Sequence, residues 1–368
     1  MKRRQFLKTA AALPVVWAGS DKVGLTAGQV ATAAARRVRP GDAAWPTPAT
    51  WENLKQAVGG RLVALTSPLE ACRAAPENPA CAEVFKELKN PYFIGDSPAL
   101  TQTSGWVDAW TSAPSAYAVA AAETADVVAA VKFAREHNLR VVVKGGGHSY
   151  QGTSNAPDSL LIWTRAMNGI ALHDSFVPKG CEGKIAPQPA VTVGSGAIWL
   201  HVYNAVTTKA GRYVQGGGCA TVGVAGLIQS GGFGSFSKSF GLAAAGLLEA
   251  EVVLADGSVR IANAGSDPEL FWALKGGGGG SLGVVTRLTL RTRELPESFG
   301  VVSGTIKART DGVFRDLIAR IIEFYDERLF NPHWGEQIRL VRKNTLDLQM
   351  LSAGLDRKQV AETWKPFV

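Results

Sequence analysis

The sequence predicts an α+β fold, in which helices and strands do not alternate in a regular array. Residues 124–138 carry apolar side chains at helical spacing, and the β-branched run 141–143 that follows is typical of a buried strand. Residues 251–254 and 258–262 flank an Asp-Gly pair, which is a strong signal for a hairpin. The chain has 368 residues, of which 46% are hydrophobic and 19% charged, so it is long enough for two domains with buried cores.

The remaining elements follow from the same patterns. Thr124 is expected to cap the helix over 124–138, and Gly211 is expected to end a helix over 197–209. Further strands are predicted at 160–163, 191–193, 284–291, 301–307, 338–341 and 346–351. Further helices are predicted at 268–274, which has Pro in its first turn, at 311–329, with Phe314, Leu317, Ile321 and Tyr325 on one face, and from 359 to the end of the chain.

The first 35 residues have the features of an export signal. The basic stretch KRRQFLK at 2–8 precedes the apolar run 10–18, which is too short to span a membrane. Arg3 and Arg4 match the twin-arginine (Tat) export pattern. We therefore expect residues 1–35 to be a signal peptide that the Tat export machinery reads, and we expect a periplasmic or secreted protein with no stable membrane span. A basic tail without structure is the alternative interpretation.

The net charge of +8 and the pI of about 9.3 raise the question of a nucleic-acid partner. Outside the N-terminus, however, no block of Lys and Arg is longer than two residues, and no aromatic–basic repeat occurs. We therefore expect no nucleic acid to bind. The charge is interpreted as a contribution to solubility and as an attraction for acidic polymers.

Four cysteines have different expected roles. Cys72 and Cys81 flank the segment RAAPENPA and are predicted to form a disulfide, which an exported protein can keep; closing this loop contributes about 3 kcal/mol in the chain-entropy model. Cys219 lies among glycines, as suits a reactive thiol, whereas Cys181 is expected to be unpaired and has no assigned role. A zinc or other metal site is not predicted, because no Cys-x₂-Cys pair or matching His pair occurs.

Three glycine-rich stretches are the main candidates for a binding site. The first, RVVVKGGGHSYQG at 140–152, runs from a strand into three glycines, whose backbone can approach a ligand closely and offer N–H groups to an anion. His148 follows at once, and a glycine turn with a structural histidine is the alternative interpretation. None of the stretches forms a Rossmann or Walker A motif in the required context. The residues alone therefore predict a phosphate cradle for an unidentified cofactor.

The other two stretches extend the pattern and carry a family resemblance. They read GGGCATVGVAGLIQSGGFGSFSKSFG at 216–241 and FWALKGGGGGSLGVVT at 271–286. Together, in this order, the three stretches resemble the PCMH-type FAD-binding domain of the vanillyl-alcohol oxidase and p-cresol methylhydroxylase superfamily, and within it the berberine bridge enzyme-like branch. The resemblance covers roughly residues 90–295. It implies a domain built of two α/β subdomains with FAD as the cofactor.

The resemblance also implies roles for individual residues. His148 would be linked covalently to the 8α carbon of the flavin and Cys219 to its C6 carbon; neutral imidazole and thiolate are both nucleophiles suited to this. The remaining FAD-binding positions that it implies are Gly145, Gly146, Gly147, Ser149, Tyr150, Gly152, Gly218, Thr221, Val222, Gly223, Gly226, Ser230, Gly231, Gly232, Gly283 and Val285. Tyr150 is equally well explained as an ordinary core residue. For Val222, the resemblance implies a position that controls the access of oxygen, and a plain core residue is again the alternative.

The sequence departs from the family pattern at two places. Leu227 stands where the berberine bridge enzymes have a His that contacts the flavin, and Ala245-Gly246 replaces a common Asp-Asn pair. Both changes remove polar groups, so we expect the electronic properties of the flavin to differ from those in the plant enzymes.

The domain organisation expected from these observations has three parts. Residues 1–35 form the signal peptide, 36–295 the FAD-binding domain, and 296–368 the N-terminal part of a substrate domain with an antiparallel sheet. The substrate domain is expected to be incomplete, so that the apolar face of the helix over 311–329 lacks partners. The family's usual catalytic base lies in the part that is expected to be missing, and no catalytic residue is therefore assigned.

Three functions are compatible with this organisation. The favoured one is a secreted oxidase that takes a hydride from a sugar or a bulky alcohol and then reduces molecular oxygen to hydrogen peroxide. The second is a dehydrogenase that passes its electrons to another periplasmic acceptor. The third is a flavin-binding fragment without catalytic activity. Peroxide production separates the first from the second, and any turnover separates both from the third.

Overall fold

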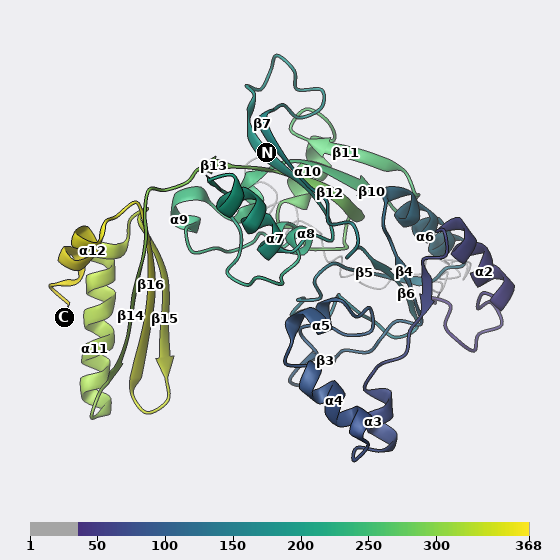
Figure 1. Ribbon diagram of the computed structural model, residues 1–368, viewed down its shortest axis with the longest axis horizontal. Helices are drawn as coiled ribbons and strands as arrows, with labels where there is room; N and C mark the ends of the chain where they lie inside the picture. Colours follow the sequence, from purple (N-terminus) through teal and green to yellow (C-terminus); the bar gives the residue numbers. More distant parts are fainter. Residues whose placement is uncertain (1–35, 368) are drawn as a thin grey trace, which may run out of the picture. The chain divides into compact units, whose positions relative to one another are not determined.

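A computed structural model describes residues 36–367, apart from the side chains of Ala74 and Glu336. The chain divides into two compact units, Met1–Arg36 and Arg37–Val368, and the second contains nearly everything described here. The predicted signal peptide lies outside the described residues. Figure 1 shows helices and sheets mixed along the second unit, as the α+β prediction requires.

The first sheet of this unit has four strands in the order β1-β4-β6-β5. Its strands are β1 (Leu62–Ala64), β4 (Tyr117–Ala120), β5 (Arg140–Lys144) and β6 (Ser159–Trp163). The last three are parallel, and β1 pairs antiparallel with β4. Helices α2 (Pro48–Ala57) and α6 (Thr124–Glu136) pack together beside it and share its hydrophobic core (Figure 1). Strand β5 ends at Lys144, directly before the three glycines of the first stretch.

The second sheet has five antiparallel strands in the order β11-β10-β12-β8-β7. These are β7 (Ile170–Phe176), β8 (Gln188–Gly194), β10 (Leu247–Val253), β11 (Val259–Asn263) and β12 (Val284–Arg291). Strands β10 and β11 form the hairpin that the Asp-Gly pair predicts. A core of small and branched apolar side chains joins the sheet to α7 (Trp199–Tyr203), α8 (Val224–Gln229), α10 (Pro268–Leu274) and the 3₁₀ helix η2 (Ala243–Gly246).

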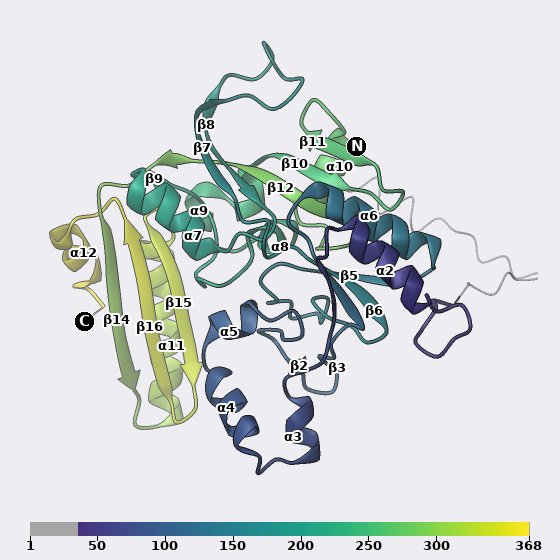
Figure 2. The same ribbon diagram turned by 45° about the vertical axis from the view of Figure 1, so that its right-hand side comes forward.

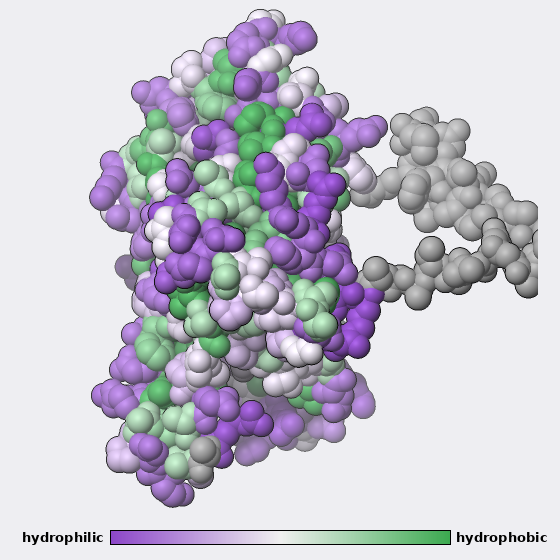
Figure 3. Space-filling model, turned by 90° about the vertical axis from the view of Figure 1, so that its right-hand side faces the viewer, coloured by the Kyte–Doolittle hydropathy of each residue, from purple (hydrophilic) through white to green (hydrophobic). Residues whose placement is uncertain are grey.

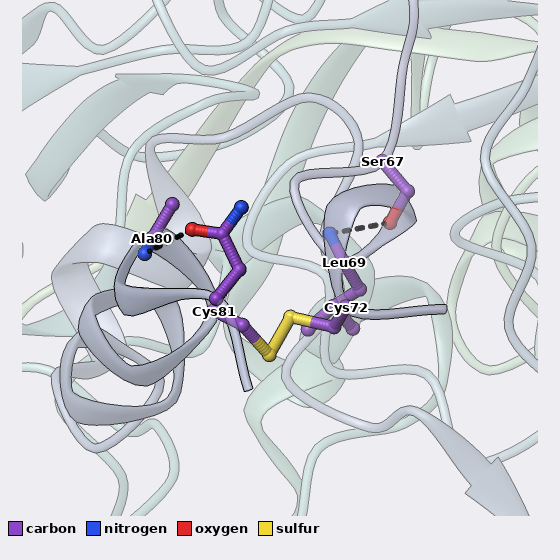
Figure 4. Close-up of a disulfide and its surroundings, with 6 residues drawn as sticks. Ser67, Leu69, Cys72, Ala80 and Cys81 are labelled. Atoms are coloured by element: carbon purple, nitrogen blue, oxygen red, sulfur yellow. Dashed lines mark hydrogen bonds between the residues drawn. A yellow bond between two sulfur atoms is a disulfide. The ribbon is translucent and has the colours of Figure 1, made fainter. Parts of the chain in front are cut away.

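Several short elements lie between β1 and β4 in the chain. They are α3 (Glu70–Ala74), α4 (Pro79–Glu87), α5 (Pro91–Gly95), and the hairpin of β2 (Gly105–Trp106) and β3 (Trp110–Thr111). The predicted disulfide between Cys72 and Cys81 is present and ties α3 to α4, as Figure 4 shows. Asn78 caps α4 by accepting a hydrogen bond from the backbone N–H of Ala80 at 2.9 Å. Farther along, β9 (Arg212–Tyr213) pairs with β13 (Arg293–Glu294), and α9 (Ser237–Phe240) ends the second glycine stretch.

The C-terminal part forms a three-stranded antiparallel sheet in the order β14-β16-β15. Its strands are β14 (Phe299–Lys307), β15 (Trp334–Val341) and β16 (Thr345–Ala353). Helix α11 (Asp311–Phe324) runs along one face of this sheet, with α12 (Arg357–Trp364) at one end (Figures 1 and 2). Ile321 and Phe324 are buried against Leu346, Met350 and Trp364. The expectation that the apolar face of this helix lacks partners is therefore wrong: the sheet and α12 cover it.

The structure also corrects several predicted helix ends. Thr124 does not cap α6, because its hydroxyl donates to Glu251 Oε1 at 2.7 Å; Glu123 is the N-cap, and Asp126 accepts from its backbone N–H. The helix predicted over 197–209 begins at Trp199 and continues as the π-helix η1 (Asn204–Lys209). The helix predicted over 311–329 likewise becomes the π-helix η3 (Tyr325–Leu329), and α12 begins two residues before its predicted start.

No helix among residues 36–367 is long and apolar enough to cross a membrane. Figure 3 shows hydrophilic and hydrophobic residues interspersed over one face of the molecule.

Candidate functional site

The first two glycine stretches meet through their backbones. A Cβ atom on Gly146 would lie 2.6 Å from Gly223 N and 2.7 Å from Thr221 O, and a Cβ on Gly223 would lie 2.8 Å from Gly146 N. Any side chain at either position would push the two loops apart. Gly147 has a φ of +76°, which favours glycine as well. The chain thus needs glycine here to bring residues 145–148 and 219–223 together.

This approach places two nucleophilic side chains on one hydroxyl. His148 Nε2 lies 3.0 Å from Thr221 Oγ1, and Cys219 Sγ lies 3.8 Å from the same oxygen. Cys219 is exposed, His148 is half-buried, and Thr221 is buried. The two residues that the family resemblance singles out are 71 positions apart in sequence, yet they converge here.

The surroundings of His148 favour its neutral form. Burial lowers the pKa of His148 below its usual value of 6.5, and a hydrogen bond to the backbone of Thr221 opposes this with a smaller effect. The imidazole is therefore mostly neutral at neutral pH and keeps a lone pair on one ring nitrogen. This is the form that acts as a nucleophile.

The other predicted residues of the second stretch lie in and around α8. Gly223 precedes the helix, Gly226 is exposed on it, and Ser230 is its exposed C-cap. Gly231 and Gly232 follow with φ of +93° and +75°. Gly218 is exposed, and a Cβ atom added to it would have no other atom within 4 Å. The backbone before Cys219 is therefore open to a ligand. Val222 is half-buried and packs against the core of the five-stranded sheet.

The residues that follow His148 in the first stretch differ in their exposure and in their contacts. Tyr150 is 72% exposed and meets the Trp106 ring edge-on at 5.8 Å between centroids, so it is not a core residue. Gly152 packs directly on the Trp110 ring. The hydroxyl of Ser149 accepts from the backbone N–H groups of Gln151 and Thr153 within its own turn.

The third stretch contributes mainly backbone. Gly283 has a φ of +148°, and a Cβ there would lie 2.7 Å from Val253 O. Val285 is 3% exposed and belongs to the core of the five-stranded sheet. Its side chain is therefore taken up by packing, and only its backbone is available to a ligand.

Sequence reasoning missed Lys144, the residue directly before the first glycines. It is 2% exposed, and Nζ donates to the carbonyls of Ser97, Pro98 and Leu100 at 3.3, 2.5 and 2.8 Å. Burial lowers the pKa of Lys144 to about 7. Gln102 N also donates to Gly147 O at 3.0 Å. Hydrogen bonds therefore hold segment 97–102 against the first glycine stretch. The sequence signal for this contact was a lysine directly after the apolar run 141–143.

A cavity of about 300 Å³ opens beside Gly216–Gly218. Four aromatic side chains line part of it: Tyr203, Tyr213, Phe236 and Phe299. Tyr203 donates from its hydroxyl to Gly217 O at 2.6 Å, and burial raises its pKa. Phe299 comes from the C-terminal sheet, so this cavity lies where that sheet adjoins the second glycine stretch. This convergence could not be predicted from local patterns, because the four residues span almost 100 positions.

Comparison with known proteins identifies the fold of this site. Residues 114–263 match a family model described as an FAD binding domain. A solved structure titled VAO-type flavoprotein MtVAO615, from Myceliophthora thermophila, has a TM-score of 0.77 and 30% identity, covering 90% of this chain and 62% of that one. The chain belongs to the VAO/PCMH superfamily of FAD-binding proteins. Its cofactor is FAD.

Curated relatives from fungi agree with this assignment. The FAD-linked oxidoreductase malF of Malbranchea aurantiaca is 39% identical over 276 residues, covering 69% of this chain and 46% of the relative. The VAO-type flavoprotein oxidase VAO615 of Thermothelomyces thermophilus is 31% identical over 358 residues, covering 90% and 60%. The chain therefore spans about half the length of the curated relatives it matches. A solved chitooligosaccharide oxidase shares the fold, with a TM-score of 0.60 and 23% identity, covering 69% of this chain and 51% of that one.

The residues of the site fit an FAD. The glycine turn at 145–147 is of the kind whose backbone N–H groups hold a pyrophosphate, and the exposed Gly218 leaves the backbone before Cys219 open to a ligand. His148 and the exposed Cys219 supply the two nucleophile types that can bond to a flavin ring. Bound FAD would supply the capacity to accept a hydride. Among residues 36–367, no group of three or more His, Cys, Asp or Glu side chains is placed to hold a metal ion.

Proposed function

We propose that this protein is an exported FAD-dependent oxidoreductase that holds its flavin through two covalent links, to His148 and to Cys219. The observation that carries the proposal is the convergence of both side chains on the Thr221 hydroxyl, at 3.0 and 3.8 Å. The lowered pKa of His148 adds to it, since a neutral imidazole is the nucleophilic form. The motif around these residues resembles the berberine bridge enzyme-like branch of the superfamily.

The reaction class that this site suits is oxidation of a C–H bond next to oxygen. The protein would bind and orient the substrate, the glycine loops would hold the cofactor in place, and bound FAD would supply the capacity to accept a hydride. We propose molecular oxygen as the second substrate, which then leaves as hydrogen peroxide. The family resemblance supports this choice, because it implies that Val222 lies beside the flavin ring, where Val leaves more space for oxygen than Leu or Ile does.

For the substrate, we propose a sugar or a bulky alcohol. A chitooligosaccharide oxidase shares the fold, which makes a carbohydrate compatible with it. The cavity beside Gly216–Gly218 has aromatic side chains on its walls, and flat aromatic surfaces pack well against sugar rings and apolar alcohols. Activity screens with oligosaccharides and aryl alcohols, read out as peroxide, test this choice.

The alternative is a dehydrogenase that passes its electrons to another acceptor. The observation that favours it is the half-buried state of Val222, whose side chain already packs against the core. Substrate turnover with an artificial dye but without peroxide would establish the dehydrogenase. No turnover with any acceptor would leave a flavin-binding fragment as the function.

Export through the Tat pathway is the remaining part of the proposal. The supporting feature is the stretch KRRQFLK, with Arg3 and Arg4 adjacent. The Tat pathway carries folded proteins, which suits one that receives its cofactor in the cytoplasm. Replacing Arg3 and Arg4 with Lys should leave the precursor inside the cell with its flavin bound, as cell fractionation would show. Unchanged export of that variant would rule the pathway out.

A further inference from the structure

The side chain of Thr221 contacts both of the predicted nucleophiles, His148 and Cys219. Its hydroxyl is within hydrogen-bonding distance of His148 Nε2 at 3.0 Å and of Cys219 Sγ at 3.8 Å. The residue is 7% exposed, so water competes little for these contacts. Among the residues that the structure describes, no other side chain is recorded as hydrogen-bonded to both nucleophiles.

Either atom of each pair can be the donor, so two arrangements of the hydrogens fit these contacts. His148 keeps a nucleophilic lone pair on Nδ1, the nitrogen away from Thr221, in the arrangement in which Nε2 donates to Thr221 Oγ1. The hydroxyl then has its own hydrogen free to donate to the sulfur of Cys219.

We propose that Thr221 is a positioning residue that prepares both nucleophiles for attachment of the flavin. By accepting from Nε2 it keeps the lone pair of His148 on Nδ1, and by donating to Sγ it orients the sulfur of Cys219. The inference rests on the proposed function, in which both residues are linked to FAD. It adds that the two links depend on one hydroxyl.

The chemistry of each attachment balances with dioxygen as the oxidant. At His148 a bond forms between the imidazole and the 8α carbon, which loses one hydrogen, while the ring hydrogen on Nε2 leaves toward Thr221. At Cys219 a bond forms between sulfur and C6, and the hydrogens of the thiol and of C6 are lost. In each case the two electrons reduce the flavin. Dioxygen takes up two electrons and two protons and leaves as hydrogen peroxide.

The structure offers a matched control for this hydrogen bond. His173 on β7 and Thr192 on β8 form the same pair, with Nε2 and Oγ1 2.8 Å apart, in the five-stranded sheet. Thr192→Val removes a His–Thr hydrogen bond of the same kind from a place that holds no predicted flavin residue. Thr221→Val removes the hydroxyl at the site, and Thr221→Ser keeps it.

The experiment follows attachment in the full-length chain. The protein and its variants are produced in a riboflavin-starved host and then supplied with FAD in air. Flavin on the peptides that contain His148 and Cys219 is followed over time by mass spectrometry. Thr221→Val should slow both attachments about tenfold, equivalent to about 1.4 kcal/mol in the barrier. Thr221→Ser and Thr192→Val should attach flavin at the unaltered rate.

A second readout separates preparation of the nucleophile from general stability. The ¹⁵N spectrum of the imidazole reports which ring nitrogen carries the hydrogen. Nε2 should carry it in the unaltered protein and in Thr221→Ser, while Thr221→Val should give a mixture of both forms.

The following results would overturn either the inference or the proposed function. If Thr221→Val attaches flavin at the unaltered rate at either residue, or if Thr221→Ser is as slow as Thr221→Val, the inference is wrong. Equal slowing in Thr192→Val would also overturn it, since the effect would then reflect stability. If the unaltered protein acquires no link at His148 or Cys219, the proposed function itself fails.

Discussion

Two glycine runs in this protein look alike in sequence but differ in structure. Both follow a lysine: Lys144 precedes Gly145–Gly147, and Lys275 precedes Gly276–Gly280. The first run is largely buried, and Gly146 is in backbone contact with the second glycine stretch. The second run is mostly exposed, and a Cβ atom added to Gly279 would have no other atom within 4 Å.

The two lysines differ in the same way. Lys144 is buried and donates to three backbone carbonyls, whereas Lys275 is half-exposed and lies over the Phe271 ring with Nζ 4.9 Å from its centroid. The comparison shows that Gly146 is buried against the second glycine stretch, whereas the second run stays mostly exposed although Gly278 N donates to Gln229 O at 2.8 Å. Substitutions at matched positions of the two runs can therefore test which one the flavin site depends on.

The largest effect is expected for Gly146→Ala. Its Cβ would lie 2.6 Å from Gly223 N, so the loops must separate, at a cost of about 1–3 kcal/mol in the free energy of unfolding. The separation should also reduce flavin binding, because His148 and Cys219 would no longer converge. Gly279→Ala is the matched control and should leave the melting temperature and the flavin content unchanged. Equal losses in both variants would contradict the distinction between the two runs.

Lys144→Met should lower the free energy of unfolding by a similar amount, and this effect should depend on pH. The variant leaves three carbonyls without their donor, which costs about 1–3 kcal/mol. In addition, the pKa of Lys144 is about 7 in the folded protein and 10.5 as a free side chain. Between these values the unfolded chain binds more protons, so the free energy of unfolding of the unaltered protein should rise with pH relative to the variant.

Denaturant unfolding at pH 7, 8.5 and 10 measures this difference. Lys275→Met is the control, and it should cost at most about 1 kcal/mol, the usual range for an exposed cation–π contact. A gap between Lys144→Met and the unaltered protein that stays constant or narrows with rising pH would refute the assigned ionisation.

The smallest structural change, Val222→Leu, is expected to act on a rate. In the proposed function Val222 lies beside the flavin, and one added methylene there should close the space through which oxygen reaches the ring. Reduction of the flavin by substrate should change little, while reoxidation in air should slow. Rapid-mixing absorbance measurements separate the two steps, and Val259→Leu, on the exposed side of β11, is the control. Reoxidation that is unchanged in Val222→Leu would exclude the oxygen gate.

Much of the fold could be predicted because local signals agreed with the final packing. The Asp-Gly hairpin of β10 and β11 and the strand before the first glycines are examples. The cap of α6 could not be predicted, since Thr124 is drawn to Glu251, which lies 127 positions later. The partners of α11 were missed for the same reason: the strands and α12 that cover it are recognisable only once the sheet is assembled.

The features of the site can also be separated into those that have a local sequence signal and those that depend on distant contacts. Its glycines, His148 and Cys219 are recognisable from the motifs, because close backbone approach and nucleophilic chemistry need these residue types. Thr221 was implied by its motif as an FAD-binding residue, but its contact with His148 across 73 positions was not. Lys144 was missed altogether, because its contacts cross 44 to 47 positions and no local pattern shows them. Val285 fits its motif, yet its side chain lies in the core.

The central claim is that FAD is bound covalently at two residues, and denaturation tests it directly. Acid-precipitated unaltered protein should stay yellow, and His148→Ala and Cys219→Ala should each keep one link. The double variant should release all its flavin, while Cys181→Ala, which removes the buried free cysteine, should keep both links. Flavin that washes out of the denatured unaltered protein would contradict the account.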